Sequence, residues 1–312
     1  MRGTVVQSTG NFYDVLLADG SIIICRLKGK FRLDNKKQTN PIAVGDFVMV
    51  EEGPGETDEQ KNYIINEILP RNNYIVRSDI HKSAYKHVIA SNIDQTVVIA
   101  SLKQPRTAFG FIDRVLITSE VYGIPAKVIF NKHDLYEEKD DELLQELMYS
   151  YNEAGYESFS TSVLNKENLE QLHQVFENKT SLIIGLSGVG KSSLVNSIFP
   201  HLNLKTGAIS AYTEKGLHTT TFAHMYRINE HSFIIDTPGI KEFGLVDIDE
   251  YEVGHYFPEI RKEMNNCKFN NCLHINETGC AVKQLLEEGK FSPSRYTSYL
   301  TFYEEIKGAK KW

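Results

Sequence analysis

Short runs of alternating hydrophobic and polar residues fill the first 70 positions of the chain. Five of them are prone to form β-strands, at residues 3–7, 12–17, 21–27, 46–51 and 63–68. Turn-forming sequences such as Ala18-Asp19-Gly20 and Gly53-Pro54-Gly55 separate them, which is typical of consecutive β-strands. The pattern predicts an OB-fold β-barrel over residues 1–70, a fold whose sheet face and loops bind oligonucleotides.

The middle of the chain changes to apolar runs that alternate with helical patterns. Residues 126–130, 181–184 and 233–235 are apolar stretches of strand length, and residues 168–176 and 192–198 indicate helices. This alternation predicts an α/β domain, which we place at residues 71–245. Its first part, residues 71–88, carries several Lys and Arg and is expected to form an exposed basic connector.

The last segment predicts a mostly helical unit over residues 246–312. Ser292 and Pro293 can cap and start a helix. The residues that follow at helical spacing are Tyr296, Tyr299, Leu300, Tyr303 and Ile306. Such a stripe is more often a packing surface than a binding face.

The composition is that of an ordinary soluble globular protein. The chain has 312 residues, a length sufficient for two or three hydrophobic cores. Of these residues 41% are hydrophobic and 24% are charged. It has no apolar run of membrane-spanning length and no signal-peptide pattern at its N-terminus. We therefore expect a cytoplasmic protein that does not engage a membrane. We also expect a monomer, because nothing in the sequence demands a dimer.

Charge is distributed unevenly along the chain. Residues 1–40 carry a net +4 and residues 261–312 a net +3, which leaves −14 for the middle of a chain of net charge −7. Basic flanks around an acidic centre suit a protein that contacts RNA with its ends, although solvated surface charge is the simpler alternative. The expected RNA contacts in the barrel are Arg26, Lys28, Lys30 and Arg32. The alternative for the barrel is a purely structural role, in which it supports the central domain and does not contact RNA.

A complete phosphate-binding loop follows the apolar run 181–184, with the sequence Gly185-Leu186-Ser187-Gly188-Val189-Gly190-Lys191-Ser192. Its glycines let backbone N–H groups turn toward a polyphosphate at the start of the next helix. Lys191 is expected to reach the β and γ phosphates and to serve catalysis, and the Ser192 hydroxyl to bind magnesium. Ser193 belongs to the same predicted nucleotide site. A chance glycine-rich turn is the alternative.

Two further motifs indicate a guanine nucleotide. Asp236-Thr237-Pro238-Gly239 follows a predicted strand, where Asp236 can hold magnesium through water and the Gly239 N–H can face the γ-phosphate. The second motif is Asn131-Lys132-His133-Asp134, which follows the predicted strand at residues 126–130. The Asp134 carboxylate can accept hydrogen bonds from guanine that adenine cannot offer. Ser162, in Thr161-Ser162-Val163, is the expected contact to the guanine carbonyl. The guanine motif precedes the phosphate loop, which reverses the usual order.

Three of the four cysteines lie together near the C-terminus. Cys267, Cys272, His274 and Cys280 offer three sulfur ligands and one nitrogen ligand within 14 residues. Three cysteines and a histidine predict a closed, structural zinc site, and free thiols with an incidental histidine are the alternative. Cys25, alone in a β-run, is expected in a core.

The motif order, completed by Gly216-Leu217-His218-Thr219-Thr220-Thr221 before Asp236, resembles the circularly permuted GTPases of ribosome assembly. Among them it is most similar to the RsgA family, over essentially the whole chain. The resemblance implies the small ribosomal subunit and its rRNA as partners, late maturation of the decoding region, and release on GTP hydrolysis. It also makes alarmone nucleotides candidate regulators. The alternative is a nucleotide-gated RNA-binding adaptor or translation-type GTPase that acts on another RNA.

The catalytic group is the least obvious part of the predicted site. Many GTPases place a glutamine after D-x-x-G to orient the attacking water, but Ile240 occupies that position here. We therefore predict slow intrinsic hydrolysis that a partner accelerates. His218 is the candidate replacement, with a packing role as the equal alternative, and Thr219 or Thr220 is expected to bind magnesium near the reaction.

Overall fold

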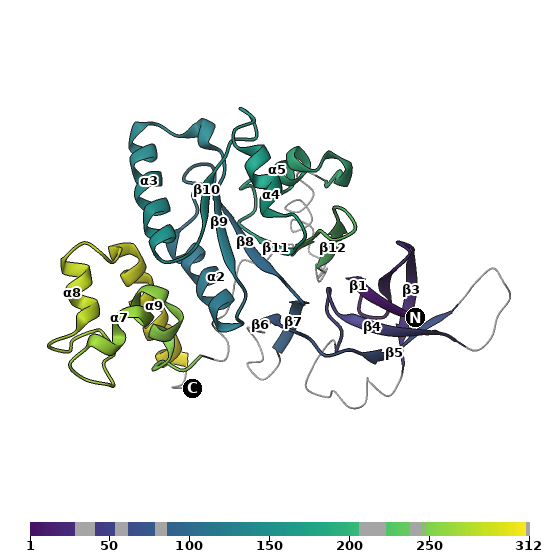
Figure 1. Cartoon of the computed structure of the whole chain (residues 1–312), viewed down its shortest axis with the longest axis horizontal. Helices are drawn as coiled ribbons and strands as arrows, with labels where there is room; N and C mark the ends of the chain where they lie inside the picture. The colour runs from purple at the N-terminus through teal and green to yellow at the C-terminus, as the bar shows by residue number, and fades with distance from the viewer. Residues whose placement is uncertain are drawn as a thin grey trace.

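The computed structural model describes residues 1–28, 41–53, 62–78, 86–205, 223–237, 245 and 248–309. Figure 1 shows a barrel at one end of the molecule, an α/β unit in the middle and a helical unit at the other end. This arrangement confirms the predicted fold class of barrel, α/β domain and helical C-terminal unit.

Five strands form the N-terminal barrel. They are β1 (Arg2–Ser8), β2 (Tyr13–Leu17), β3 (Ile22–Leu27), β4 (Phe47–Glu52) and β5 (Tyr63–Ile68). They pair in the order β1-β2-β3-β5-β4, and β4 pairs again with β1 to close the barrel. Alternate residues point inward, so Val5, Val15, Cys25 and Ile65 are fully buried in its core. The barrel and the buried position of Cys25 match the predictions.

The central sheet is parallel except at one edge. Its strands are β8 (Gln95–Ala100), β9 (Ala126–Phe130), β10 (Ser158–Ser160), β11 (Thr180–Ile184), β12 (His224–Arg227) and β13 (Phe233–Asp236). They lie in the order β10-β9-β8-β11-β13-β12, with β12 antiparallel to β13. Every residue of β8 is buried, as expected of a parallel strand covered on both faces.

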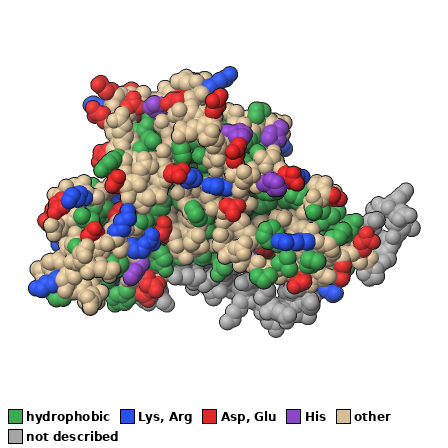
Figure 2. All heavy atoms as spheres, in the orientation of Figure 1, with side chains coloured by type: hydrophobic (Ala, Val, Ile, Leu, Met, Phe, Trp, Pro, Cys, Tyr) green, Lys and Arg blue, Asp and Glu red, His purple; other side chains and the backbone are tan. Residues whose placement is uncertain are grey.

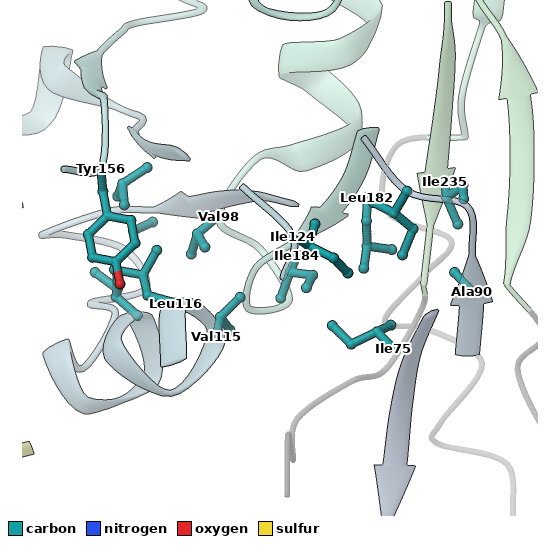
Figure 3. Close-up of a cluster of buried hydrophobic side chains, with 14 of the residues drawn as sticks. Ile75, Ala90, Val98, Val115, Leu116, Ile124, Tyr156, Leu182, Ile184 and Ile235 are labelled. Carbon is teal, nitrogen blue, oxygen red and sulfur yellow. The ribbon is translucent and has the colours of Figure 1, made fainter. Parts of the chain in front are cut away.

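Two hydrophobic clusters lie on the two faces of this sheet. One contains residues of α2 (Phe109–Val121) and α3 (Glu138–Glu153), and the other contains residues of α4 (Leu169–Val175) and α5 (Lys191–Ile198). In Figure 3, Val98 and Ile184 of the sheet lie close to Val115 and Leu116 of α2. The sheet is therefore fixed from both sides, and the loops that leave its strands start from a rigid frame.

The predicted exposed connector at residues 71–88 is wrong. Its strand β6 (Tyr74–Ser78) pairs antiparallel with β7 (Lys86–Ser91), and Ile75 of β6 is fully buried in the core of the α/β unit. Arg71 donates to the buried Asp46 carboxylate through Nε and Nη2, at 2.6 and 2.7 Å. The apolar run Tyr74-Ile75-Val76 accounts for the buried strand, and the ion pair with Asp46 accounts for Arg71, which is not a freely exposed charge.

The barrel and the central sheet are joined edge to edge. Gln7 of β1 pairs with His224 of β12, so the structure contains one continuous eleven-stranded sheet. Asp46 adds a second link, because its carboxylate also accepts from Ser91 Oγ of β7 at 2.6 Å. The barrel is thus attached to the α/β unit by strand pairing and by a buried polar cluster.

The C-terminal unit packs against α2. Its helices are η3 (Val253–Tyr256), α7 (Pro258–Glu263), η4 (Met264–Asn266), α8 (Ala281–Glu287) and α9 (Pro293–Ala309). The predicted helix does begin at Pro293, and Tyr299 and Ile306 are buried, so its stripe is a packing surface. Ile117 of α2 belongs to the same hydrophobic cluster. Among the described residues, no helix is long and apolar enough to cross a membrane.

Candidate nucleotide and metal sites

The phosphate loop connects β11 to α5 and depends on its glycines. Gly188 and Gly190 have φ values of +81° and +96°, a region that residues with a Cβ rarely adopt. A Cβ on Gly190 would lie 2.4 Å from Asn131 Nδ2, and one on Gly185 would lie 2.4 Å from the Ile99 carbonyl oxygen. The loop therefore packs against two other parts of the chain so closely that only glycine fits at these points.

Lys191 begins α5 and turns back over this loop. Its ammonium donates to the carbonyl oxygens of Gly185, at 2.8 Å, and Leu186, at 3.0 Å. Burial lowers the pKa of Lys191, and the charge of nearby Asp236 opposes that shift. Ser192 and Ser193 follow in the first turn of α5, partly exposed. The predicted phosphate-binding residues 185–193 thus form one loop and helix start.

Asp236 lies beside the phosphate loop because β13 pairs with β11. It is opposite Ile183 in that pair, and only 8% of it is exposed. Its Oδ1 atom is buried and has no hydrogen-bond partner among the described residues, and the same holds for Thr237 Oγ1. Burial raises the pKa of Asp236, and the positive charge of Lys191 partly offsets this rise. A buried carboxylate oxygen left open beside the Lys191 charge fits a group that binds magnesium through water.

The predicted guanine motif is in direct contact with the phosphate loop. Asn131 is buried and its Nδ2 donates to the Val189 carbonyl oxygen at 3.0 Å. Lys132, in the left-handed region at φ +67°, donates from Nζ to the Gly188 carbonyl oxygen at 2.8 Å. The same ammonium bonds to the Gln104 carbonyl oxygen, a contact that the sequence did not indicate. Motifs in reversed sequence order therefore meet at one end of the sheet.

Asp134 and Ser162 also come together. The Ser162 hydroxyl donates to Asp134 Oδ1, and the backbone N–H of His133 donates to the Thr161 carbonyl oxygen at 3.1 Å. Ser162 is fully buried. The loop after β9 and the loop after β10 are thus bonded to each other, as two halves of one base-binding site require.

Several predicted residues lie outside the described part of the chain. They are His218, Thr219, Thr220, Gly239, Ile240, Lys30 and Arg32. Of the predicted RNA contacts, Arg26 lies over the Phe12 ring, 5.1 Å from its centroid, and Lys28 pairs with Glu51 at 3.3 Å. Ile22 and Ile24 are exposed on the same strand as Arg26. Figure 2 accordingly shows hydrophobic side chains among the charged ones on the barrel, rather than a broad basic surface.

Cys267, Cys272, His274 and Cys280 form a group that could hold a metal ion. Their ligand atoms all lie within 4.8 Å of one another. His274 Nδ1 is 3.5 Å from the sulfurs of both Cys267 and Cys280. Zinc bound at about 2.3 Å from sulfur and about 2.0 Å from nitrogen spaces its ligands at roughly 3.5–3.8 Å. The two nitrogen–sulfur distances match this spacing, and the ligand atoms that lie farther apart need to move by only about 1 Å to bind this ion.

Replacing Gly190 by Ala is expected to weaken nucleotide binding by about 10-fold or more. The new Cβ must displace Asn131 and adopt a left-handed φ, at a cost of about 1–3 kcal/mol. Fluorescence titration with GTP measures the effect. Gly123→Ala is the matched control, since its φ of +64° imposes similar strain but no atom of the described residues lies within 4 Å of the added Cβ. Equal GTP affinity in both variants would contradict the predicted packing.

Comparison with known proteins finds relatives that match the chain over almost its whole length. A family model described as RsgA GTPase matches residues 68–246, and one described as RsgA N-terminal domain matches residues 2–64. The chain is 43% identical over 310 residues to a Bacteroides fragilis protein named small ribosomal subunit biogenesis GTPase RsgA, covering 99% of this chain and 98% of that one. It is 47% identical over 306 residues to the protein of that name from Christiangramia forsetii, covering 97% and 96%.

Solved structures are similar over the same length. The crystal structure of YjeQ from Thermotoga maritima superposes with a TM-score of 0.78 at 33% identity, covering 98% of both chains. YloQ, described as a circularly permuted GTPase, superposes with a TM-score of 0.71 at 32% identity, covering 99% of this chain and 95% of that one.

Proposed function

Because the chain belongs to the RsgA GTPase family, we propose that it hydrolyses GTP to GDP and phosphate while it assists late maturation of the small ribosomal subunit. The observation that carries the proposal is the contact of Asn131 with the Val189 carbonyl oxygen. It brings a base-binding loop and a phosphate-binding loop into one site. The names of the relatives supply the small ribosomal subunit as the target.

In this proposal the two joined loops hold the two ends of the nucleotide. Asp134 accepts hydrogen bonds from the guanine edge, Ser162 positions Asp134, and the Lys132 stem covers the base. The N–H groups of residues 185–190 and the Lys191 ammonium bind the phosphates. Magnesium neutralises charge on those phosphates when it is bound, and Ser192 and Asp236 would hold it.

Hydrolysis is proposed to be slow until the small subunit binds. Ile240 cannot orient a water molecule as a glutamine would. His218 remains our candidate for that role, with Thr219 and Thr220 as magnesium contacts in the GTP state. The protein is then released from the subunit when GTP has been hydrolysed.

The remaining sites are proposed to serve attachment to the subunit. The zinc held by Cys267, Cys272, His274 and Cys280 is structural, since it has no open position for a substrate. Arg26 and Lys28 of the barrel are proposed RNA contacts, together with Lys30 and Arg32. We propose that the protein acts as a monomer in the cytoplasm, where small subunits mature, with domains at residues 1–70, 71–245 and 246–312.

The proposal is tested with Lys191→Ala and isolated small subunits. Small subunits are expected to raise GTP turnover of the wild-type protein by orders of magnitude, while large subunits and free RNA leave it unchanged. Lys191→Ala is expected to lower the stimulated turnover roughly 100-fold or more, because a charge that stabilises the transferring phosphate is lost. Phosphate release measures the rate.

Lys139→Ala is the matched control, because this exposed lysine on α3 is in neither loop. It should retain the wild-type rate with small subunits. A wild-type rate that small subunits fail to raise would refute the proposed target, and a Lys191→Ala variant as active as the wild type would refute the proposed site.

A further inference from the structure

The imidazole ring of His133 bonds to two carboxylates at once. Nδ1 lies 2.9 Å from each oxygen of Glu167, and Nε2 lies 2.9 Å from Asp141 Oδ1. An ionised carboxylate only accepts hydrogen bonds, and a neutral imidazole has one N–H. Both ring nitrogens must therefore donate, so this arrangement is that of the protonated ring.

These two carboxylates belong to different parts of the site. Glu167 is tied to the loop after β10, because its N–H donates to the Ser162 carbonyl oxygen at 2.9 Å and its carbonyl oxygen accepts from Thr161 Oγ1 at 2.7 Å. Asp141 lies in the first turn of α3. The His133 ring thus links the loop after β9 to the loop after β10 and to α3.

We propose that protonated His133, held by Glu167 and Asp141, is a positioning residue that fixes the two guanine-binding loops relative to each other and makes guanine-nucleotide release depend on pH. The inference rests on the proposed function, since it takes Asp134 and Ser162 to bind the base. His133 precedes Asp134 directly, so any movement of its ring is passed to the carboxylate that reads guanine. His133 itself need not touch the nucleotide.

The surroundings of the ring favour its charge. The charged groups that contact the ring are Glu167 after β10 and Asp141 on α3. In sequence, Lys132 and Asp134 adjoin His133 in its own loop, Asp140 adjoins Asp141, and Lys166 adjoins Glu167. Asp140 is already paired with Lys103 at 2.7 Å, and Tyr136 presents its ring at an angle of 78°. Burial lowers the pKa of His133, but the hydrogen bonds and charges of Glu167 and Asp141 outweigh it and raise the pKa above 6.5.

The direction of the pH effect follows from this raised pKa. Below the ordinary histidine pKa of about 6.5 the ring is charged and both bonds are present. As the pH rises through the higher pKa of the folded protein, the ring loses a proton and one of the two bonds. The guanine loops are then held less firmly, and the nucleotide should leave faster.

Dissociation of GDP carrying a fluorescent group on its ribose, chased with unlabelled GDP, tests this in the full-length protein. Between about pH 6 and about pH 8.5 the wild-type rate is expected to rise about 2- to 5-fold, the range for partly exposed ion pairs. His133→Gln should release the labelled GDP fast at all these pH values, with a flat profile. Glu167→Gln, which keeps the shape of the side chain, should release it faster at low pH and depend less on pH.

His173→Gln is the matched control, since His173 of α4 also lies near a carboxylate, 3.5 Å from Glu177, but outside both loops. It should keep the wild-type profile. A flat wild-type profile, or a His133→Gln variant with the wild-type pH dependence, would overturn the positioning role and leave the guanine site intact. Failure of the wild-type protein to bind labelled GDP at any pH would overturn the proposed site and this inference together.

Discussion

Arg295→Met is expected to lower the free energy of unfolding by about 3–5 kcal/mol, because it removes the cation from between the buried Asp113 carboxylate and the largely buried Glu259 carboxylate. Arg295 is 1% exposed in α9. It bonds to Asp113 Oδ1 of α2 at 2.8 Å, and to both oxygens of Glu259 in α7, at 2.7 and 2.9 Å. Burial disfavours its charge, but Asp113 and Glu259 raise its pKa. Unfolding in urea measures the loss.

The same substitution at Arg114 provides the control. Arg114 also joins α2 to α9, with Nη1 bonded to Glu305 Oε1 at 2.8 Å, but the Glu305 side chain is 46% exposed. Arg114→Met should cost about 1 kcal/mol or less. Adding Asp113→Leu to Arg295→Met should recover part of the loss, since it removes one of the unpaired carboxylates. A loss for Arg295→Met no greater than for Arg114→Met would contradict this account.

The pairing of Arg295 with Asp113 could not be predicted from the sequence. Asp113 and Arg295 are 182 positions apart, and each taken alone is an ordinary charged residue on a helix. Only the packing of α9 on α2 makes them partners. The start of α9 at Pro293 was predictable, because a proline in the first turn and a helical stripe are local signals.

In the nucleotide site, too, some residues could be predicted from the sequence and others could not. The loops of Lys191 and Asn131 were predictable, since short motifs carry their chemistry in adjacent residues. The roles of Gln104 and Glu167 were not, because they act through contacts made only in the folded chain. One signal was available for Glu167: it follows Thr161-Ser162-Val163 closely enough to fold back on that loop.

The sequence predicted the barrel as a separate unit, but in the structure its strand β1 pairs with β12 of the central sheet. Alternating strands and turns indicated its five strands, but a pairing such as that of Gln7 with His224 leaves no local pattern in the sequence. The incorrect prediction at residues 71–88 has another origin, because the apolar run Tyr74-Ile75-Val76 is a local signal of a buried strand. Basic residues indicate an exposed segment only where they lack a buried partner, and Arg71 has one in Asp46.

Removing the metal from the cysteine and histidine cluster is expected to destabilise the whole C-terminal unit. The loop that carries His274 is held to α9 by Tyr296, which donates to the His274 carbonyl oxygen at 2.8 Å, and by Tyr299, which donates to the Leu273 carbonyl oxygen at 2.5 Å. Without the ion, Cys267 and Cys280 no longer close this loop. We expect a chelator to lower the melting temperature by roughly 10 °C or more, which differential scanning calorimetry measures.

A substitution within the cluster distinguishes the loss of stability caused by metal removal from other effects of the chelator on the protein. Cys272→Ser should reduce the metal content measured by mass spectrometry from one zinc per chain to less than one, and should lower the melting temperature in the same direction as the chelator. Cys25→Ala is the matched control, because Cys25 is a buried thiol in the barrel core, far along the chain from the cluster. It should keep both the zinc and the response to the chelator. A Cys272→Ser protein that keeps a full zinc equivalent and the wild-type melting temperature would show that these four residues do not form the site that holds the C-terminal unit together.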